Sequence, residues 1–154
     1  MAIVLDGGLN KITGVPGTLM QVVQGSNSTY QLTNSSTPVT TNLSVTITPT
    51  STTSKVLIMI HGAGAGTNGA TVGAEYSIYK NGSSLFVFDR LNHYAANYSY
   101  GPVTACYLDS PATLSATTYT LYYRVYSGSG NCYLNNYASG AFSQSTITAM
   151  EIAG

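Results

Sequence analysis

The hydrophobic positions of this chain recur with a period of two, in short runs that turn residues interrupt. Between Leu43 and Thr48, Leu, Val and Ile alternate with Ser and Thr, and Pro49 ends the run. This alternation is typical of a strand with one buried and one solvated face. No window of about 11 residues or more carries the stripe of an amphipathic helix. The pattern predicts an all-β chain.

Similar runs predict strands along the whole chain, and the stretches between them are rich in Gly, Pro, Asn, Ser and Thr. The predicted strands cover residues 2–5, 11–16, 19–24, 43–48, 55–61, 74–80, 85–88, 103–108, 118–126 and 145–152. The longer stretches 25–41, 62–73 and 90–101 are expected to be loops. About eight main strands with turns between them are typical of an antiparallel β-sandwich or a jelly roll.

The clearest turn signal is the dipeptide Asn81-Gly82. It lies between the predicted strands 74–80 and 85–88. Asn and Gly readily adopt the positive φ angles that a type I′ turn requires, so we expect a tight hairpin here.

Some predicted strands carry hydrophobic residues on both faces. In the strand 55–61, Val and Ile occupy one face while Leu57 and Met59 occupy the other. The strands 118–126 and 145–152 show the same two-sided pattern. A sandwich of this length has too little chain to cover the outside of its own sheet. We therefore expect identical copies to cover it, as symmetric homo-oligomers commonly do.

The composition adds an unusual scarcity of charge. Among 154 residues, five are Lys or Arg and five are Asp or Glu, so the formal net charge is zero. This excludes the basic surface of a nucleic-acid-binding protein and the cationic face of a membrane-surface helix. The longest apolar run, Val56 to Ile60, is too short to insert across a membrane, and the first residues lack the pattern of a secretory signal. A net charge near zero favours association between protein molecules. We therefore expect partners to cover much of the surface.

Five strand segments follow one another in a characteristic order along the chain. They are Leu19–Gln24, Leu43–Pro49, Ser54–Met59, Tyr76–Gly82 and Ser145–Ile152. In this order they resemble a module of tailed bacteriophages that occurs in tail fibres and other virion surface proteins. The opening segments Met1–Gly7 and Ile12–Val15 are similar to the N-termini of such proteins. The resemblance covers roughly residues 19–152.

The resemblance implies a jelly roll of the tumour necrosis factor (TNF) and complement type that assembles as a homotrimer. In such a trimer three inner sheets meet around the axis, which agrees with the strands that are apolar on both faces. The residues expected at this trimer interface are Leu57, Met59, Tyr122, Tyr126 and Met150.

The same resemblance divides the chain into an N-terminal arm, residues 1–18, and a jelly-roll domain, residues 19–154. We expect the arm to attach the protein to the virion by adding a strand to the edge of another protein's sheet. The arm residues expected to do this are Ala2, Ile3, Val4 and Leu5.

Two functions follow from the resemblance. The first is a trimeric capsid decoration or cement protein, which binds the major capsid protein or another virion protein and stabilises the outer shell. The alternative is the receptor-binding tip of a tail fibre or head fibre, which recognises host surface glycans. A fibre needs a shaft, and the short arm leaves no room for one, so decoration is favoured. Either function places the protein on the virion surface after assembly in the host cytoplasm.

Tyrosines gather in two stretches of the sequence that are also rich in Asn. Tyr94, Tyr98 and Tyr100 lie in the first stretch, and Tyr133 and Tyr137 lie in the second. Tyr and Asn suit polar recognition, and aromatic rings stack on sugars, so these residues are candidates for surface recognition of a glycan. The alternative is that their rings pack the loops onto the sandwich or onto a neighbouring subunit.

The sequence offers little for catalysis, and no enzyme, cofactor or metal site is expected. The Gly-rich stretch 62–66 partly matches a dinucleotide-binding loop, but the third required Gly is replaced by Thr67 and no helix is predicted to follow. It also partly matches the oxyanion loop of α/β-hydrolases, yet no G-x-S-x-G elbow is present. We expect a flexible loop instead. The two histidines, His61 and His93, show no metal-ligand spacing with the cysteines or carboxylates.

The two cysteines, Cys106 and Cys132, leave two alternatives open. A disulfide between them would stabilise the fold by closing a loop. Assembly in a reducing cytoplasm favours free thiols, whereas the later exposure of a virion to an oxidising exterior favours the bridge.

Overall fold

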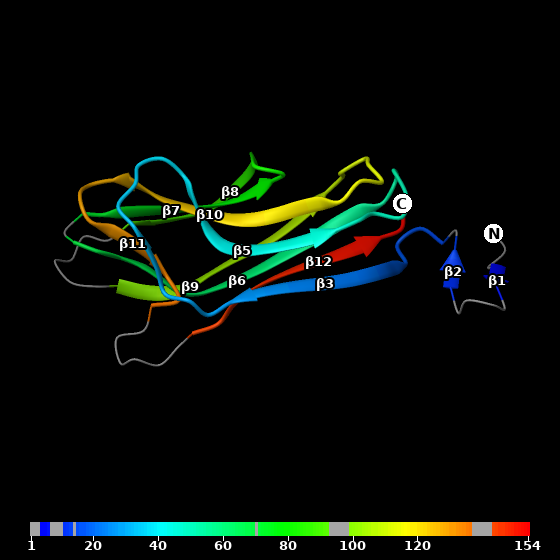
Figure 1. The fold of residues 1–154 in the computed structure, drawn as a ribbon, viewed down its shortest axis with the longest axis horizontal. Coiled ribbons are helices and arrows are strands. Elements are labelled where there is room, and N and C mark those ends of the chain that lie inside the picture. The colour runs from blue at the N-terminus through cyan, green and yellow to red at the C-terminus, as the bar shows by residue number, and fades with distance from the viewer. Residues whose placement is uncertain (1–3, 7–10, 14, 70, 93–98, 137–142) are drawn as a thin grey trace.

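The computed structural model describes residues 4–6, 11–13, 15–69, 71–92, 99–136 and 143–154, which form antiparallel strands joined by turns and loops (Figure 1). The strands are β1 (Val4–Asp6), β2 (Lys11–Thr13), β3 (Leu19–Asn27), β4 (Gln31–Thr33), β5 (Val39–Ile47), β6 (Lys55–Asn68), β7 (Gly73–Lys80), β8 (Ser83–Asn92), β9 (Ser99–Asp109), β10 (Thr117–Ser127), β11 (Asn131–Leu134) and β12 (Ser145–Ile152). Within these ranges no helix is long and apolar enough to cross a membrane.

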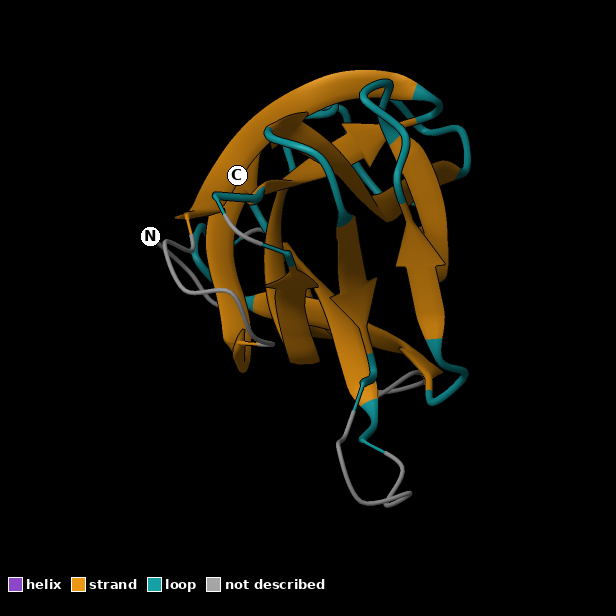
Figure 2. Cartoon of the chain, turned by 90° about the vertical axis from the view of Figure 1, so that its left-hand side faces the viewer, coloured by secondary structure: helices purple, strands orange, loops and turns teal. Residues whose placement is uncertain are grey.

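Two sheets pack face to face (Figures 1 and 2). The four-stranded sheet has the order β5-β10-β7-β8, and the six-stranded sheet has the order β3-β12-β6-β11-β4 with β9 also paired to β6. Strand β6 is long enough to hold three neighbours, because β12 and β11 follow one another along one edge and β9 runs along the other. The antiparallel β-sandwich predicted from the sequence is confirmed.

The alternating strand of the sequence pattern has one buried face, as predicted. Leu43, Val45 and Ile47 are at most 5% exposed, while the Ser and Thr residues between them are exposed. The three hydrophobic side chains belong to one core cluster with Ile58 and Ile147 of the opposite sheet. Period-two patterning therefore sets which face of β5 enters the core.

The predicted hairpin at Asn81-Gly82 is also confirmed. Lys80 pairs with Ser83, so two residues form the loop between β7 and β8. The φ angles of Asn81 and Gly82 are 48° and 82°, both in the left-handed region. In addition, Oδ1 of Asn81 accepts a 2.8 Å hydrogen bond from the backbone N–H of Thr118 on β10.

The Gly-rich stretch is not the flexible loop that the sequence predicted, because β6 runs through it to Asn68. The strand is irregular there, and Gly64 has a φ of 52°. A Cβ on Gly62 would lie 2.6 Å from Cγ2 of Val103, and one on Gly64 would overlap the backbone of Asn136. The glycines therefore permit close approach of neighbouring segments rather than mobility.

The predicted loop 25–41 is likewise mostly strand. β3 extends to Asn27, β5 begins at Val39, and β4 lies between them. Strand β11 was not predicted either, and it pairs with both β4 and β6. Strands of three or four residues are too short for an alternating pattern to reveal, and tertiary pairing decides them.

The two sides of the sandwich are closed differently. On one side, Gln21 and Asn27 of β3 donate from their side-chain amides to backbone carbonyls of residues 48 and 41, at 2.7 and 3.0 Å. On the other side, the rings of Phe86 on β8 and Tyr107 on β9 stack with their centroids 5.0 Å apart. Amide hydrogen bonds hold the first side together. The second side combines ring packing with a 3.0 Å ion pair between Lys80 of β7 and Asp109 of β9.

Candidate functional site

The outer face of the six-stranded sheet carries a line of hydrophobic side chains across four strands, which we call the apolar row. It consists of Val22 on β3, Met150 on β12, Leu57 on β6 and Leu108 on β9, each directly opposite the next in the strand register. Val22 is 52% exposed and Leu108 is 54% exposed, and the two central residues are half-buried. A protein surface rarely presents such a continuous apolar line to water without a partner.

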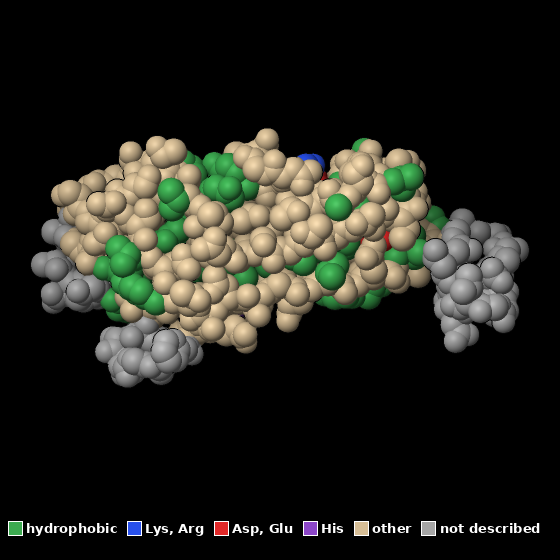
Figure 3. All heavy atoms as spheres, in the orientation of Figure 1, with side chains coloured by type: hydrophobic (Ala, Val, Ile, Leu, Met, Phe, Trp, Pro, Cys, Tyr) green, Lys and Arg blue, Asp and Glu red, His purple; other side chains and the backbone are tan. Residues whose placement is uncertain are grey.

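On one side, the apolar row borders the register partners Leu19, Ile152 and Lys55, and on the other side the face becomes polar. The next line of register partners is mixed, with Met59 and Cys106 beside Gln24 and Thr148. The line after that contains only Ser, Thr and His61. Hydrophobic side chains gather in Figure 3 along the edge of the view below β3 and β12, and almost no charged side chains are visible there.

Of the residues expected at a trimer interface, Leu57, Met59 and Met150 lie together on this face, and Met59 is 44% exposed. Val22 and Leu108 join them, although the sequence analysis did not single them out. The signal that could have identified them is a pair of adjacent apolar residues in each strand, Val22-Val23 and Tyr107-Leu108, which places one apolar side chain on each face.

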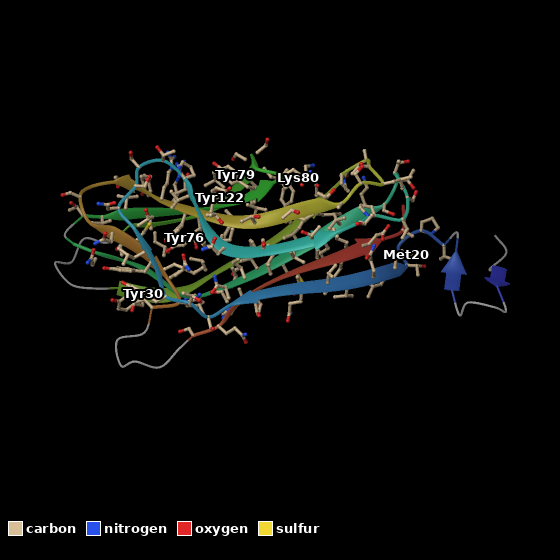
Figure 4. All side chains as sticks on the ribbon, viewed as in Figure 1. Met20, Tyr30, Tyr76, Tyr79, Lys80 and Tyr122 are labelled. Carbon is tan, nitrogen blue, oxygen red and sulfur yellow. The ribbon has the colours of Figure 1, made fainter. Side chains whose placement is uncertain are left out.

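The other two expected interface residues, Tyr122 and Tyr126, do not lie on that face. Both belong to β10, and their side chains are on the outer face of the four-stranded sheet, on the opposite side of the sandwich. The ring of Tyr122 stacks on Tyr79 with centroids 3.9 Å apart, as Figure 4 shows, and the guanidinium of Arg90 lies 5.4 Å from the ring centroid of Tyr126. The structure thus separates these tyrosines from Leu57, Met59 and Met150, because β10 pairs into the other sheet.

The outer face of the four-stranded sheet also carries a compact ionic network. Glu75 is only 3% exposed, and its carboxylate accepts hydrogen bonds from Arg124 at 2.8 and 3.0 Å and from Arg90 at 2.9 Å. Burial alone would raise the pKa of Glu75, but the hydrogen bonds from Arg124 and Arg90 outweigh it and hold the pKa below its usual value. This face therefore satisfies its own charges, in contrast to the apolar row.

Three tyrosines from separate segments meet at the end of the sandwich far from the chain termini. The ring of Tyr133 lies between those of Tyr30 and Tyr100, with centroid separations of 6.0 and 6.1 Å. Gly66 lies between Tyr133 and Tyr100 in the strand register, so no side chain separates the two rings. Figure 4 shows Tyr30 at this end.

Among the tyrosines expected to contact a glycan, the structure therefore brings Tyr100 and Tyr133 together. Tyr133 is only 3% exposed, which contradicts its expected role in surface recognition and agrees with the alternative that these rings pack against the sandwich. Tyr94, Tyr98 and Tyr137 lie outside the described residues. Among the three described tyrosines at this end, the exposed ring is that of Tyr30, at 45%. It was not predicted, because it is a single aromatic residue in a polar stretch.

Asn135 holds the aromatic end together. Its side-chain amide donates two 3.0 Å hydrogen bonds, to the carbonyl oxygens of Asn27 and Thr29, in the segment that leads to Tyr30. Its Oδ1 accepts a 2.6 Å hydrogen bond from the hydroxyl of Ser145. Asn135 is only 3% exposed and satisfied on both sides, so its bonds anchor the segment that leads to Tyr30.

Both cysteines are free, which corrects the alternative of a disulfide. Cys106 is exposed on the outer face of the six-stranded sheet, directly opposite Met59. Cys132 is fully buried in the core, where burial raises the pKa of its thiol to about 12. One thiol faces solvent and the other faces the core, so the fold keeps them apart.

The N-terminal arm forms a separate small sheet. β1 and β2 pair with one another and with neither large sheet, and Figure 1 shows them beyond the end of the sandwich at which the C-terminus lies. Val4 and Leu5 fall in β1, whereas Ala2 and Ile3 lie outside the described residues. The first strand of the sandwich begins at Leu19.

The residues considered for catalysis are dispersed. His61 is exposed on the outer face of the six-stranded sheet, and His93 lies outside the described residues. The described part of the chain holds no group of three or more His, Cys, Asp or Glu side chains that could bind a metal ion. A shallow hollow of about 380 Å³ lies over β8 at residues 87–90.

The sequence matches no model of a known protein family. It also matches no curated protein.

Solved structures show distant likenesses. The dimeric latent PorU of Porphyromonas gingivalis is 10% identical, with a TM-score of 0.47, over 90% of this chain and 13% of that chain. The VP2 subviral particle of infectious bursal disease virus is 15% identical, with a TM-score of 0.44, over 100% of this chain and 42% of that chain. A protein chain in the structure of the Gx strain of that virus is 13% identical to this chain, with a TM-score of 0.42 and the same coverage. The chain thus spans less than half the length of each of these chains.

Proposed function

We propose that this chain is a structural protein of a bacteriophage virion, which binds the outer surface of the capsid as a homotrimer and stabilises the shell. The apolar row carries this proposal. It consists of four hydrophobic side chains in register on one outer face, of which Val22 and Leu108 are more than half exposed.

Further copies of the same chain are the partner that fits the apolar row best. The four residues of the row, Val22, Met150, Leu57 and Leu108, include no ionic group that would select a charged partner. Closed symmetric homo-oligomers are the commonest way in which a soluble chain covers such a face. The trimer itself rests on the resemblance of the sequence to TNF-like virion modules.

The strand orders support a jelly roll. Apart from the hairpin of β7 and β8, the main strands alternate between the sheets along the chain. β3, β12, β6 and β9 belong to one sheet, and β5, β10, β7 and β8 belong to the other. Eight strands in two sheets with connections that cross between them are the pattern of that fold.

The arm supports attachment to the shell. β1 and β2 form a short hairpin beyond the sandwich, and its strands retain edges that neither large sheet covers. An exposed strand edge binds another sheet by adding a strand to it, so the arm suits attachment to a capsid protein.

Binding to purified particles of the encoding phage tests this function. Particles stripped of the protein are mixed with the intact chain or with a variant that lacks residues 2–16, and the bound protein is measured by sedimentation and gel densitometry. We expect hundreds of copies of the intact chain per particle, a shell that resists heating better, and loss of binding for the shortened variant.

A matched control keeps attachment separate from assembly. The shortened variant must retain the mass of the intact oligomer in analytical ultracentrifugation, because the arm lies outside the sandwich. Tens of copies per particle, with inhibition of adsorption by free protein, would instead indicate a receptor-binding tip. Undiminished binding of the shortened variant would contradict attachment through the arm.

A further inference from the structure

The aromatic end of the sandwich presents a small, fixed surface, which we call the distal end because it is opposite the arm. Among the described residues at this end, the large hydrophobic side chains that are exposed are Tyr30, at 45%, and Leu32, at 51%. Both lie beside the buried ring of Tyr133: Tyr30 stacks on it, and Leu32 is its partner in the strand register. Asn136 adds an amide, which donates a 3.0 Å hydrogen bond to the hydroxyl of Tyr100.

This surface is organised before any ligand arrives. The Tyr30 ring rests on Tyr133, whose backbone carbonyl accepts a 2.6 Å hydrogen bond from the buried hydroxyl of Tyr76. The turn before Tyr30 is tied by Asn135 and by an Asx turn in which Oδ1 of Asn27 accepts from the backbone N–H of Thr29. A ligand that stacks on Tyr30 therefore loses little affinity to ordering of the protein.

The distal end is also built from charge-free sequence. Its strands and turns come from the stretches 12–54, 56–74, 91–108 and 125–150, none of which contains Asp, Glu, Lys or Arg. The polar side chains of residues 27–34, which surround Tyr30 and Leu32, are amides and hydroxyls. This part of the surface suits a neutral ligand rich in hydroxyl groups.

The size of the surface favours a saccharide over a protein. Two half-exposed side chains amount to about 200 Å² of apolar surface, since a whole aromatic side chain buries about 150–250 Å². A stable protein interface needs about 800 Å² on each partner. One ring face with hydrogen-bonding groups around it matches the apolar face and hydroxyl rim of a single sugar ring.

We propose that the distal end binds a neutral saccharide, with Tyr30 as the ring on which the sugar stacks. This inference goes beyond the structural role, because a particle coated with this protein would then carry many weak sugar-binding sites directed away from the shell. It does not depend on attachment to a capsid, so each of the two proposals can fail without the other.

Affinity electrophoresis of the full chain in gels that contain a neutral polysaccharide tests the inference. Dextran, mannan and agarose-derived galactan serve as neutral probes, and alginate and heparin serve as charged ones. We expect retardation by at least one neutral probe and none by the charged probes. Tyr30→Ala should weaken the retardation by about tenfold, the effect of removing a central aromatic anchor, whereas Tyr30→Phe should retain it.

Tyr122→Ala is the matched control, because it removes another ring that stacks on a tyrosine neighbour but lies on the outer face of the four-stranded sheet. It should leave retardation unchanged. Thermal unfolding monitored by circular dichroism verifies that each variant is folded. The inference is overturned if no neutral probe retards the folded chain, if only charged probes do, or if Tyr30→Ala and Tyr122→Ala behave alike.

Discussion

The side-chain amide of Gln21 donates a 2.6 Å hydrogen bond to Oε2 of Glu151, its direct partner in the register between β3 and β12. Glu151 is fully buried, and its other oxygen accepts from the backbone N–H and hydroxyl of Thr50 and from the hydroxyl of Ser54, at 2.6 to 2.8 Å. The carboxylate therefore joins the first and last strands of the sheet to the turn after β5, without a cationic partner among these bonds.

Replacing Glu151 by Gln should destabilise the fold by about 3 kcal/mol, because an amide nitrogen would face hydrogen-bond donors in a buried site. The free energy of unfolding in urea measures the effect. Gln24→Ala is the control on the same sheet, since its exposed amide donates to the hydroxyl of Thr148, and its effect should stay within about 0.5 kcal/mol. Equal losses for the two variants would contradict the role of Glu151.

Stability should fall as the pH is lowered below the usual range of a carboxyl pKa. Burial alone would raise the pKa of Glu151, but hydrogen bonds from Gln21, Ser54 and Thr50 hold this pKa below its ordinary value of 4.5. The pKa of Glu75 is also lowered. A lowered folded pKa stabilises the protein above pH 4.5, and this contribution is lost as the pH falls through the folded pKa. Urea midpoints between pH 3 and pH 7 test this, and E151Q should show a flatter profile.

The two thiols should differ in reactivity. Cys106 is exposed, whereas Cys132 is fully buried with a pKa raised to about 12. A thiol reagent at neutral pH should modify one cysteine in the folded chain and both after unfolding. If identical copies cover the face around Met59, the rate at Cys106 should also fall as the protein concentration rises. Rapid modification of Cys132 in the folded state would contradict the structure.

A charge in the apolar row should break self-association. Leu57 occupies the centre of the row, so Leu57→Lys would require burial of an unpaired ammonium group between copies. We expect sedimentation to show a multiple of 16.1 kDa for the intact chain and a single chain for this variant. Tyr122→Lys, on the other outer face, is the control and should leave the mass unchanged. A single-chain species of the unaltered protein at high concentration would exclude the assembly.

Two glycines in strands of the same sheet should respond differently to Ala. A Cβ on Gly25 would overlap the backbone carbonyl of Ser44, where β3 and β5 approach each other, whereas a Cβ on Gly101 meets nothing within 4 Å. We expect Gly25→Ala to cost about 2 kcal/mol or more through displaced backbone, and Gly101→Ala to be close to neutral. Urea unfolding of both variants provides the comparison.

Local chemistry was sufficient for several features of this protein. The alternation around Leu43 identifies a buried face, and the pair Asn81-Gly82 identifies a hairpin. The two-sided strand at Leu57 and Met59 identifies an outer sheet face that carries apolar side chains. Each depends on side-chain direction along one strand or on the φ preference of one turn, and both are properties of the sequence itself.

Tertiary pairing decided the rest. Which outer face a two-sided strand belongs to depends on its sheet, and this separates Tyr122 and Tyr126 from Met150. The same holds for the Gly-rich stretch, which becomes a strand only because β9 and β11 pair with it, and for Tyr30, which joins Tyr133 across a register that no local pattern encodes. Contacts between distant segments follow from register and layer, and those are properties of the assembled sandwich.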